Sequence, residues 1–261
     1  KRTAETHELE NDIAELKDIL EKPAKVKRII MDELQAVAKK YGEPRRSEIL
    51  YDAAAAEGDE DEDAVPDYPV SVFFTREGYF KKITPQSLRM SGEQKLKEGD
   101  EITVQLETKN SAELLFFTSR CQVYKCRAAD FADTKASMMG DYIPARLAMD
   151  EGEVPVYMAV TEDYRGYMFF LFENGKAAKV PMDAYATKNN RKKLLNAFSD
   201  KSPLVYAAYL RQEEEIAIQN SAGRMLLVHS AQVPAKQTKN TAGVNVMTLK
   251  KNQRITQVRR A

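Results

Sequence analysis

Apolar positions divide the chain into a helical beginning and a strand-rich remainder. Between residues 4 and 21 they recur at spacings of 4, 3 and 4, at Leu9, Ile13, Leu16 and Leu20. This near-heptad seam predicts a helix, which Pro23 ends because proline lacks the backbone N–H that a helix interior needs.

A second helix is predicted from about Lys25 to Tyr41, followed by the stop signal of Gly42 and Pro44. Its apolar positions share one face: Val26, Ile30, Leu34, Val37 and Tyr41. A single apolar stripe needs a partner surface. Residues 1–50 are therefore interpreted as the end of a coiled-coil arm whose other strand is absent from this chain. The alternative is a helical hairpin that folds onto the following domain.

From Tyr68 onward the pattern predicts β-structure. Short apolar, β-branched or aromatic runs alternate with turn signals, and no long amphipathic helix interrupts them, which argues against folds of alternating strands and helices. The predicted strands cover residues 70–74, 79–83, 101–107, 113–118, 122–126, 154–160, 167–172, 176–180, 203–210, 215–219, 224–229 and 253–258.

Four segments of this region repeat one order: strand, tight turn, strand with basic residues, irregular polar stretch, strand. Their turns centre on Gly78, Cys121, Gly175 and Gly223, which are 43, 54 and 48 residues apart. Glycine supplies the positive φ of a tight turn. Because Arg120 and Cys121 replace it in the second repeat, we expect that turn to differ. A period of about 40–50 residues with four strands per unit is typical of propellers, and a solenoid of hairpins is the alternative.

Charge is balanced over the whole chain but not along it. The 261 residues hold 40 Lys and Arg against 40 Asp and Glu, which would argue against a nucleic-acid binder. Residues 1–67, however, carry a net charge of −8, and residues 68–261 carry +8. Within the second part, residues 176–261 alone carry +11. Such a basic region is expected of a polyanion binder, although ordinary solvated Lys and Arg are the alternative. The gradient predicts that DNA runs mainly along repeats three and four.

Residues 51–67 differ in character from both neighbours. Small residues are followed by six acidic residues among the seven from Glu57 to Asp63, and then by Pro66. Like charges at this density repel and keep a chain extended, so we interpret the segment as a linker. A passive tether is favoured over a polyanion that competes with DNA for the basic domain.

Composition adds three limits. Hydrophobic residues make up 43% and charged residues 31% of the chain, as in globular proteins. No apolar run approaches the ~20 residues of a membrane helix. Two cysteines in a chain of this length argue against a disulfide scaffold and for a reducing compartment. Because residue 1 is Lys, we expect a piece of a longer protein.

Two features resemble the C-terminal region of the A subunit of bacterial type IIA topoisomerases, DNA gyrase and topoisomerase IV. Residues 27–49, KRIIMDELQAVAKKYGEPRRSEI, are similar to the signature K-Y-G-[DE]-x-R-R-[ST]-E-I that closes the coiled-coil part of these subunits. The matching positions are Lys40, Tyr41, Gly42, Glu43, Arg45, Arg46, Ser47, Glu48 and Ile49. The repeats TREGYFKKI, FENGKAAKV and NSAGRMLLV, with residues 239–258, resemble blades of the family's β-pinwheel, in which neighbouring blades exchange strands.

The resemblance implies a mainly β fold, a β-pinwheel of about four blades over residues 68–261, preceded by a short α-helical coiled-coil remnant. It implies a non-catalytic domain that binds and bends DNA and guides a duplex segment to an ATP-dependent strand-passage core. The implied partners are double-stranded DNA, bound without sequence preference, the ATPase B subunit and the second A subunit. No contact with a membrane is implied. The whole enzyme would be an isomerase of the bacterial cytoplasm, associated with the nucleoid.

The chain departs from gyrase at one place. Gyrase A subunits carry the basic box Q-R-R-G-G-K-G in the first blade, where residues 88–100 here read LRMSGEQKLKEGD. Gly92 and Lys95 remain, but no paired arginine or Gly-Gly does. The departure indicates a closer likeness to topoisomerase IV.

Catalytic chemistry is not expected in this fragment. In the family, a tyrosine attacks DNA with the help of an arginine and Mg²⁺, upstream of this region, and none of the twelve tyrosines here stands in that Arg-Tyr motif. No Walker motif for ATP exists. Cys121 and Cys126 lack the spacing and the second ligand pair of a zinc site. No cofactor is therefore expected here, while Mg²⁺ and ATP are implied for the whole topoisomerase.

The predicted DNA contacts are basic residues of the repeats and their loops. Because side chains alternate along a strand, a lysine next to Tyr79 or Phe80 is expected to face solvent and phosphate. The full set is Arg76, Lys81, Lys82, Arg89, Lys95, Lys125, Arg127, Lys176, Lys179, Lys188, Arg191, Lys192, Lys193, Arg224, Lys236, Lys239, Lys250, Lys251 and Arg254. Such contacts read the backbone and not the bases. The alternatives are a propeller that binds protein and, less favoured, an independent enzyme.

Overall fold

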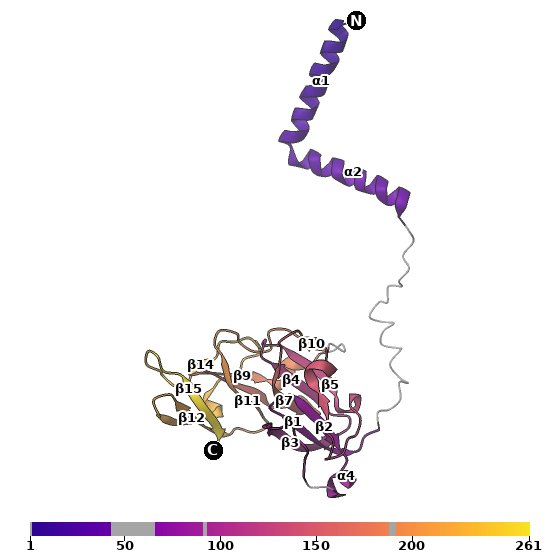
Figure 1. Ribbon diagram of the computed structural model, residues 1–261. Coiled ribbons are helices and arrows are strands. Elements are labelled where there is room, and N and C mark those ends of the chain that lie inside the picture. Colours follow the sequence, from indigo (N-terminus) through magenta and orange to yellow (C-terminus); the bar gives the residue numbers. More distant parts are fainter. Residues whose placement is uncertain (1, 43–65, 91–92, 188–191) are drawn as a thin grey trace. The chain divides into compact units, whose positions relative to one another are not determined.

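The computed structural model of the chain describes residues 2–42, 66–90, 93–187 and 192–261 (Figure 1). The chain divides into two compact units, residues 1–62 and 63–261. The predicted boundaries at residues 50 and 67 stay predictions, since most of the acidic segment lies outside the described residues.

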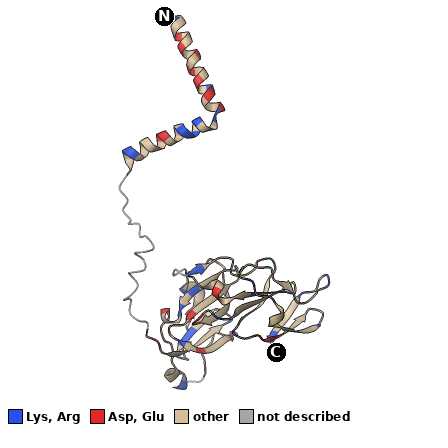
Figure 2. Cartoon of the chain, turned by 180° about the vertical axis from the view of Figure 1, so that it is seen from behind, with Lys and Arg blue, Asp and Glu red and all other residues tan. Residues whose placement is uncertain are grey.

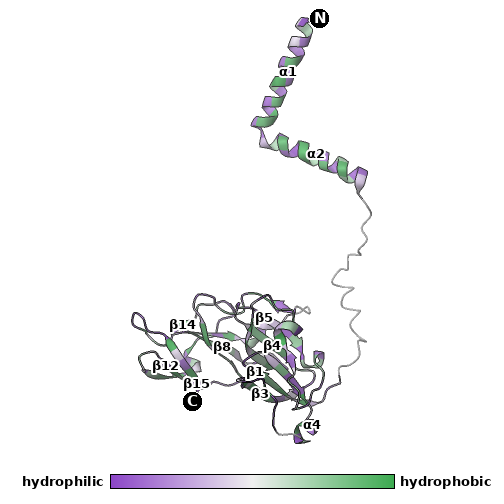
Figure 3. Cartoon of the chain, viewed as in Figure 1, coloured by the Kyte–Doolittle hydropathy of each residue, from purple (hydrophilic) through white to green (hydrophobic). Residues whose placement is uncertain are grey.

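The first unit contains both predicted helices, α1 (Arg2–Glu21) and α2 (Pro23–Tyr41). Pro23 stands at the first position of α2, where its missing N–H costs nothing. Neither helix buries a residue, and the apolar seams are exposed, with Leu16 at 61% and Leu34 at 62%. The green stripes of α1 and α2 in Figure 3 are these seams. The coiled-coil interpretation stays a prediction.

The second unit consists of four antiparallel sheets, which we call blades 1 to 4. Blade 1 has the strand order β3-β1-β2-β6 (Ile102–Lys109, Pro69–Thr75, Tyr79–Ile83, Asp141–Tyr142). Blade 2 has the order β7-β4-β5-β10 (Pro155–Thr161, Glu113–Thr118, Val123–Arg127, Lys193–Leu194).

Blade 3 has the order β11-β8-β9-β14 (Leu204–Leu210, Tyr167–Phe172, Lys176–Pro181, Val244–Asn245). Blade 4 has three strands in the order β15-β12-β13 (Ile255–Arg260, Glu215–Asn220, Met225–His229). Short helical turns connect the strands: α4 (Pro85–Met90), η1 (Ala128–Asp130), α5 (Ile143–Arg146), η2 (Met182–Tyr185) and η3 (Ser230–Gln232). The four-bladed, propeller-like fold predicted from the repeats is confirmed.

Neighbouring repeats exchange strands. β6 belongs to the second repeat in sequence but pairs with β2 of blade 1, and β10 of the third repeat pairs with β5 of blade 2. β14 of the fourth repeat likewise pairs with β9 of blade 3. We call these two-residue segments exchange strands. Each of the first three blades is therefore completed by the repeat that follows it, as in a β-pinwheel.

The core lies between the blades, so a central strand is buried on both faces. In β4, Phe116 packs on Phe74 of blade 1, with ring centroids 5.6 Å apart, and Phe117 packs on Phe170 of blade 3 at the same separation. Figure 3 shows the corresponding hydrophobic strands. The outward positions of β12, by contrast, are Ala217 and Gln219, which give blade 4 a less apolar outer face.

The second turn corrects one prediction. Cys121 adopts φ +56°, in the same left-handed region as Gly78, Gly175 and Gly223. Its N–H donates to the carbonyl of Thr118, three residues back, just as the N–H of Gly78 donates to Thr75. The expectation that this turn differs is wrong for the backbone, because the sheet fixes the turn geometry and the cysteine accepts a conformation that favours glycine.

Candidate nucleic-acid interface

Four of the predicted DNA contacts lie inside the β unit. Lys81, Lys82, Lys125 and Lys179 are only 1%, 2%, 9% and 5% exposed. The expectation that a lysine beside Phe80 faces solvent is wrong, because β2 is covered on both faces and alternation leaves it no solvent side. These ammonium groups are engaged within the protein instead of being presented to phosphate.

Lys82, Lys125 and Lys179 occupy equivalent places, four residues after their turn residues, and we call them the inter-blade lysines. The ammonium of Lys82 donates to Asn110 at 2.7 Å and lies 3.2 Å from Asp133. Both partners, Asn110 and Asp133, follow the strands of the first repeat in the sequence. The lysine therefore ties blade 1 to the chain of the next repeat.

The other two inter-blade lysines also bind the repeat that follows, Lys125 through Thr187 and Lys179 through Glu213 and Ser230, and Lys125 pairs in addition with Glu113 of its own blade. Lys125 lies 3.4 Å from Glu113 and donates to the hydroxyl of Thr187 at 3.1 Å. Lys179 donates to Glu213 and to the carbonyl of Ser230. In blade 4 the equivalent residue is Leu227, which is 52% exposed. The basic residues that recur in the repeats are thus partly structural.

Lys81 anchors the segment that replaces the gyrase box. Its ammonium donates to the carbonyl of Lys95 at 2.6 Å and lies 3.3 Å from the carbonyl of Ala136. Burial lowers the pKa of this lysine. The side chain of Lys95 itself is exposed.

The remaining described candidates reach the surface, fully or in part. Most are exposed, while Lys193 and Lys239 are half-buried: Arg76, Arg89, Lys95, Arg127, Lys176, Lys192, Lys193, Arg224, Lys236, Lys239, Lys250, Lys251 and Arg254. Blue segments along the strands and loops in Figure 2 mark basic residues. Lys188 and Arg191 lie outside the described residues. As DNA contacts, all of these stay predictions.

Strand exchange decides where the basic loops lie. The segment after Thr187 belongs to the third repeat, yet the carbonyl of Lys192 accepts the N–H of Lys125 in blade 2 at 2.8 Å. In the fourth repeat, the N–H of Lys236 donates to the carbonyl of Lys179 in blade 3 at 2.9 Å. Lys192 of repeat three and Lys236 of repeat four therefore lie along the edges of blades 2 and 3.

The loop of residues 249–254 lies elsewhere, at the turns of blades 3 and 4. The carbonyl of Arg254 accepts the N–H of Ser221 at 2.8 Å, and the N–H of Ile255 donates to the carbonyl of Glu173 at 3.0 Å. Arg254 also lies 3.8 Å from the carboxylate of Glu173. This basic loop is separated in the fold from the loops on the edges of blades 2 and 3.

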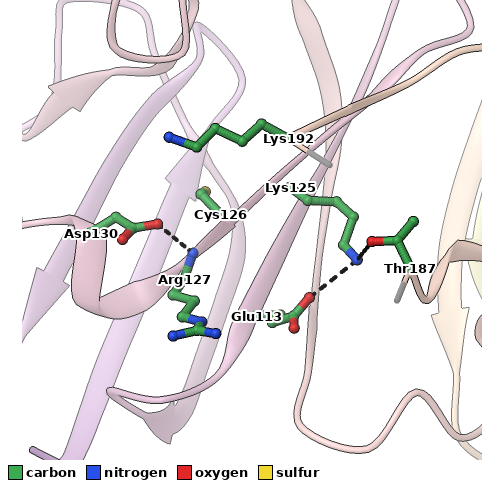
Figure 4. Close-up of a pocket in the computed structure, with 7 residues that line it drawn as sticks. All are labelled: Glu113, Lys125, Cys126, Arg127, Asp130, Thr187 and Lys192. Atoms are coloured by element: carbon green, nitrogen blue, oxygen red, sulfur yellow. Dashed lines mark hydrogen bonds and ion pairs between the residues drawn. The ribbon is translucent and has the colours of Figure 1, made fainter. Parts of the chain in front are cut away.

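A polar cavity of about 250 Å³ lies at the edge of blade 2, where β10 pairs with β5 (Figure 4). Its lining combines three cations, two carboxylates, a thiol and a hydroxyl: Lys125, Arg127, Lys192, Glu113, Asp130, Cys126 and Thr187. Burial raises the pKa of the Cys126 thiol, so this side chain stays neutral. Burial raises the pKa of Tyr164, and the hydrogen bond that its hydroxyl donates to Glu113 raises it further.

Sequence reasoning missed one cation of this region, Arg146 of α5. It stacks over Phe131, 5.8 Å from the ring centroid, and donates to the carbonyl of Asp130 at 2.8 Å. It also lines a cavity next to Lys192. Residues of the second repeat meet residues of the third here only through strand exchange, for which the sequence carries no local signal.

The described residues contain no cluster of three or more His, Cys, Asp or Glu that could hold a metal ion. Both cysteines are free thiols. No described helix is both long and apolar enough to cross a membrane.

Comparisons with known proteins agree with the fold. Residues 214–261 match the family model "DNA gyrase C-terminal domain, beta-propeller". The A subunit of DNA gyrase from Mycobacterium tuberculosis is 30% identical over 236 residues, which cover 85% of this chain and 26% of that protein. The A subunit of DNA topoisomerase 4 from Staphylococcus epidermidis is 28% identical over 251 residues, 94% of this chain and 31% of that protein. The chain is a homologue of the type IIA topoisomerase A subunits.

Solved structures of this family have the same fold. The C-terminal domain of a topoisomerase IV superposes with a TM-score of 0.66 at 23% identity, covering 76% of this chain and 62% of that structure. The Escherichia coli ParC C-terminal domain gives 0.57 at 14% identity, covering 74% and 79%. The chain spans less than a third of the length of the curated A subunits it matches.

Proposed function

We propose that residues 68–261 are a non-catalytic domain of a type IIA topoisomerase A subunit that binds and bends duplex DNA and guides it to the strand-passage core. The observation that carries the proposal is the placement of exposed cations by strand exchange. Arg127 and Lys192 line one cavity at the edge of blade 2, and Lys176 and Lys236 lie on blade 3. In a homologue of DNA topoisomerase subunits, such edges suit a polyanionic partner.

The expected mode of binding is backbone-led. Exposed Arg and Lys neutralise phosphates without reading base edges, so binding is independent of sequence. Edges of successive blades are not collinear, and a duplex that follows them has to bend. Bending a short duplex costs about 1–6 kcal/mol, which several phosphate contacts can offset. The inter-blade lysines hold the blades and do not contact DNA in this proposal.

Binding of a short fluorescent duplex, measured by anisotropy at several salt concentrations, tests the proposal. The logarithm of the association constant should fall linearly with the logarithm of salt concentration, by about 0.9 for each phosphate neutralised. A second duplex of scrambled sequence is the control and should bind equally. Affinity that does not change between low and moderate salt would contradict the proposal.

We also propose that the domain behaves like that of a topoisomerase IV. Residues 85–90 form α4, and the carbonyl of Lys95 is used to hold Lys81. The segment at the place of the gyrase box is thus bound to the buried Lys81 through the carbonyl of Lys95. When nicked circular DNA is ligated with the domain bound, we expect little unidirectional writhe. Strong writhe of one sign would indicate gyrase-like wrapping.

One observation favours the alternative, a protein-interaction module. Met225 and Leu227 of β13 are 56% and 52% exposed, and they stand on the outer face of blade 4. Capture of a protein partner, together with no mobility shift on duplex DNA, would support this function in place of DNA binding.

The role within the whole enzyme is also a proposal. We expect strand cleavage, Mg²⁺ and ATP hydrolysis to reside in other parts of the topoisomerase. The expected partners in the bacterial cytoplasm are a B subunit with ATPase activity plus the second copy of the A chain. The described residues supply no metal cluster for strand cleavage. The chain alone should leave supercoiled plasmid unrelaxed, and relaxation would show an activity of its own.

A further inference from the structure

Blades 1 to 3 bind the segment of the following repeat at the same points. At each turn, the carbonyl of the turn residue accepts an N–H from one of the three residues after the exchange strand. The pairs are Ile143 to Gly78 at 2.9 Å, Ala197 to Cys121 at 2.7 Å and Met247 to Gly175 at 3.1 Å. The three donors are apolar and buried. A backbone bond and an apolar side chain thus fix each segment at the turn.

Two further points of contact lie along the strand after each turn. The exchange strand pairs with residues one to three places after the turn residue. The backbone of the inter-blade lysine, four places after the turn residue, bonds to the same following repeat. The carbonyl of Lys82 accepts from Thr134 at 2.7 Å, and that of Lys179 accepts from Lys236 at 2.9 Å. Each of these blades therefore has a docking edge that the following repeat fills.

A glycine precedes two of the exchange strands because the backbones approach closely there. A Cβ atom added at Gly140, before β6, would lie 2.2 Å from the carbonyl oxygen of Phe80. One added at Gly243, before β14, would lie 2.2 Å from that of Ala177. Phe80 and Ala177 both stand two places after their turn residues. The docking edge thus favours a glycine, then two extended residues, then an apolar residue.

The same edge of blade 4 holds no segment among the residues that the structure describes. Blade 4, with β12 and β15, lies at one end of the β unit (Figure 1), and β13 is its last strand. A Cβ atom added at Gly223 would meet nothing within 4 Å, so the turn is open. Met225, two places after Gly223, is 56% exposed, whereas the residues at that place in blades 1 to 3 are buried: Phe80, Val123 and Ala177.

Backbone groups of β13 point to this open edge. The N–H of Asn220 in β12 donates to the carbonyl of Arg224 at 3.0 Å. Bonded residues alternate along an antiparallel pair. With the register of β12 and β13, the N–H and C=O groups of Met225 and Leu227 therefore point away from β12. An unpaired sheet edge of this kind is a template for another strand.

We propose that β13 is a docking edge for an extended segment of another protein, in which a glycine and two extended residues precede an apolar residue. The segment adds a strand to blade 4, as in other cases of β-augmentation. Main-chain hydrogen bonds to β13 and to the carbonyl of Gly223 hold it, and Met225 is covered. The edge does not use the basic residues of the proposed DNA interface, so this function goes beyond DNA binding.

The side chain four places after the turn indicates the kind of partner. In blades 1 and 3 the inter-blade lysine meets a carboxylate of the following repeat, Asp133 or Glu213. Blade 4 has Leu227 at this place, 52% exposed, which suits an apolar side chain and offers no charge to a carboxylate. A second copy of the chain is disfavoured, because its three exchange strands are each paired in their own blades. An apolar extended segment of a different protein is the occupant that fits.

The test uses the whole chain and a synthetic probe. The probe is a fluorescent peptide of residues 241–249, TAGVNVMTL, which carries β14 in the pattern that the edge favours. Amide hydrogen exchange, followed by NMR, should slow at Met225 and Leu227 when the peptide is added. The same peptide with Gly243→Ala is the control and should bind about ten-fold more weakly, because its methyl group meets the carbonyl of Met225.

Two exposed methionines provide matched variants of the protein. Met225→Ser removes an apolar contact of the proposed edge. Met138→Ser is the control, because Met138 is also 56% exposed but belongs to the loop after η1 in the second repeat. Both changes affect surface side chains, so both variants should fold. Fluorescence anisotropy should show about ten-fold weaker peptide binding for Met225→Ser and less than about two-fold change for Met138→Ser.

Three results would overturn the proposal. Exchange that changes in residues 176–179 and not in β13 would show that the peptide only displaces β14 in blade 3. Protection of Met225 and Leu227 that rises with protein concentration, without peptide, would assign the edge to a second copy. Unchanged exchange at both amides with excess peptide would show that the edge binds no segment. Since the probe contains no DNA, duplex binding by the same samples tests the proposed function separately.

Discussion

Single residues at equivalent places of the repeats differ in what surrounds them. Gly175 and Gly223 both adopt φ +78°. A Cβ atom added at Gly175 would lie 2.3 Å from the carbonyl oxygen of Met247, in the chain that follows exchange strand β14, whereas one added at Gly223 would meet nothing within 4 Å. The same turn is thus crowded in blade 3 and open in blade 4.

This contrast makes a matched pair of substitutions. Gly223→Ala should lower the free energy of unfolding by about 1 kcal/mol, the cost of a left-handed backbone alone. Gly175→Ala should lower it by about 3 kcal/mol, because the chain near Met247 must also move. Urea unfolding followed by circular dichroism measures both values. Equal losses of unfolding free energy would show that the chain after β14 does not restrict the turn at Gly175.

Buried Lys179 offers a second contrast with its exposed neighbour Lys176. Replacing Lys179 by Met removes the ammonium that donates to Glu213 and to the carbonyl of Ser230, and should cost about 2 kcal/mol. Lys176→Met should change stability by less than about 0.5 kcal/mol. Urea unfolding of both variants at neutral pH provides the measurement, and similar losses would contradict the role of Lys179.

The same pair predicts a pH dependence. Burial raises the pKa of Glu213, but hydrogen bonds from Lys179 and Ser230 outweigh it, and the net shift is below the ordinary value of 4.5. A lowered pKa stabilises the fold above the unfolded value, and this contribution is lost as pH falls through the folded pKa. The stability difference between wild type and Lys179→Met should therefore shrink from pH 6 to pH 3. A difference that grows toward acid pH would refute the assignment.

At the scale of elements, long strands were predictable and exchange strands were not. Residues 113–118 and 167–172 are apolar runs bounded by turns, and both are strands in the structure. β6, β10 and β14 have only two residues each, too few to show any period. Alternation of side chains predicts an exposed face only for a strand that is covered on one side, and β2, which carries Lys81 and Lys82, is covered on both. The cavity of blade 2 was unpredictable, since it requires knowing which repeat completes which blade.

We expect that an exchange strand can be displaced without unfolding the other strands of its blade. A Cβ atom at Gly243, just before β14, would lie 2.2 Å from the carbonyl oxygen of Ala177 in β9. Gly243→Ala should therefore displace β14 and speed amide hydrogen exchange in residues 176–178. The equivalent residues 79–81 of blade 1, of which Tyr79 and Phe80 pair with β6, are the internal control. Uniform acceleration in both blades would indicate global destabilisation instead.

At the scale of the whole molecule, zero net charge hides two oppositely charged parts. Residues 1–67 carry −8 and residues 68–261 carry +8. Sequence alone shows this division, but not that three of the positive charges, the inter-blade lysines, are buried between neighbouring repeats. Of the basic residues in the repeats, the inter-blade lysines and Lys81 are withdrawn from solvent. The charge gradient predicts a DNA path along repeats three and four, and strand exchange places Lys192 of repeat three on blade 2 and Lys236 of repeat four on blade 3.

A fragment of residues 63–261 tests whether the basic part folds and binds DNA without the acidic part. It contains all the residues of the buried core and should unfold at the same temperature as the whole chain. It should also bind duplex DNA more tightly at low salt, because the acidic part has been removed and long-range repulsion disappears. The gain should vanish at high salt, where charges are screened. A lower melting temperature would show that the first part stabilises the second.

Strand exchange also has a consequence for the order of synthesis. A ribosome delivers the chain from its N-terminal end, and domains begin to fold as they emerge. β9 ends at Pro181, but its partner β14 begins only at Val244. Blade 3 therefore stays incomplete until most of the fourth repeat has been translated, and the same delay holds for each blade before it. The nascent protein carries one open sheet edge throughout its synthesis, which is the kind of edge that chaperones protect from aggregation.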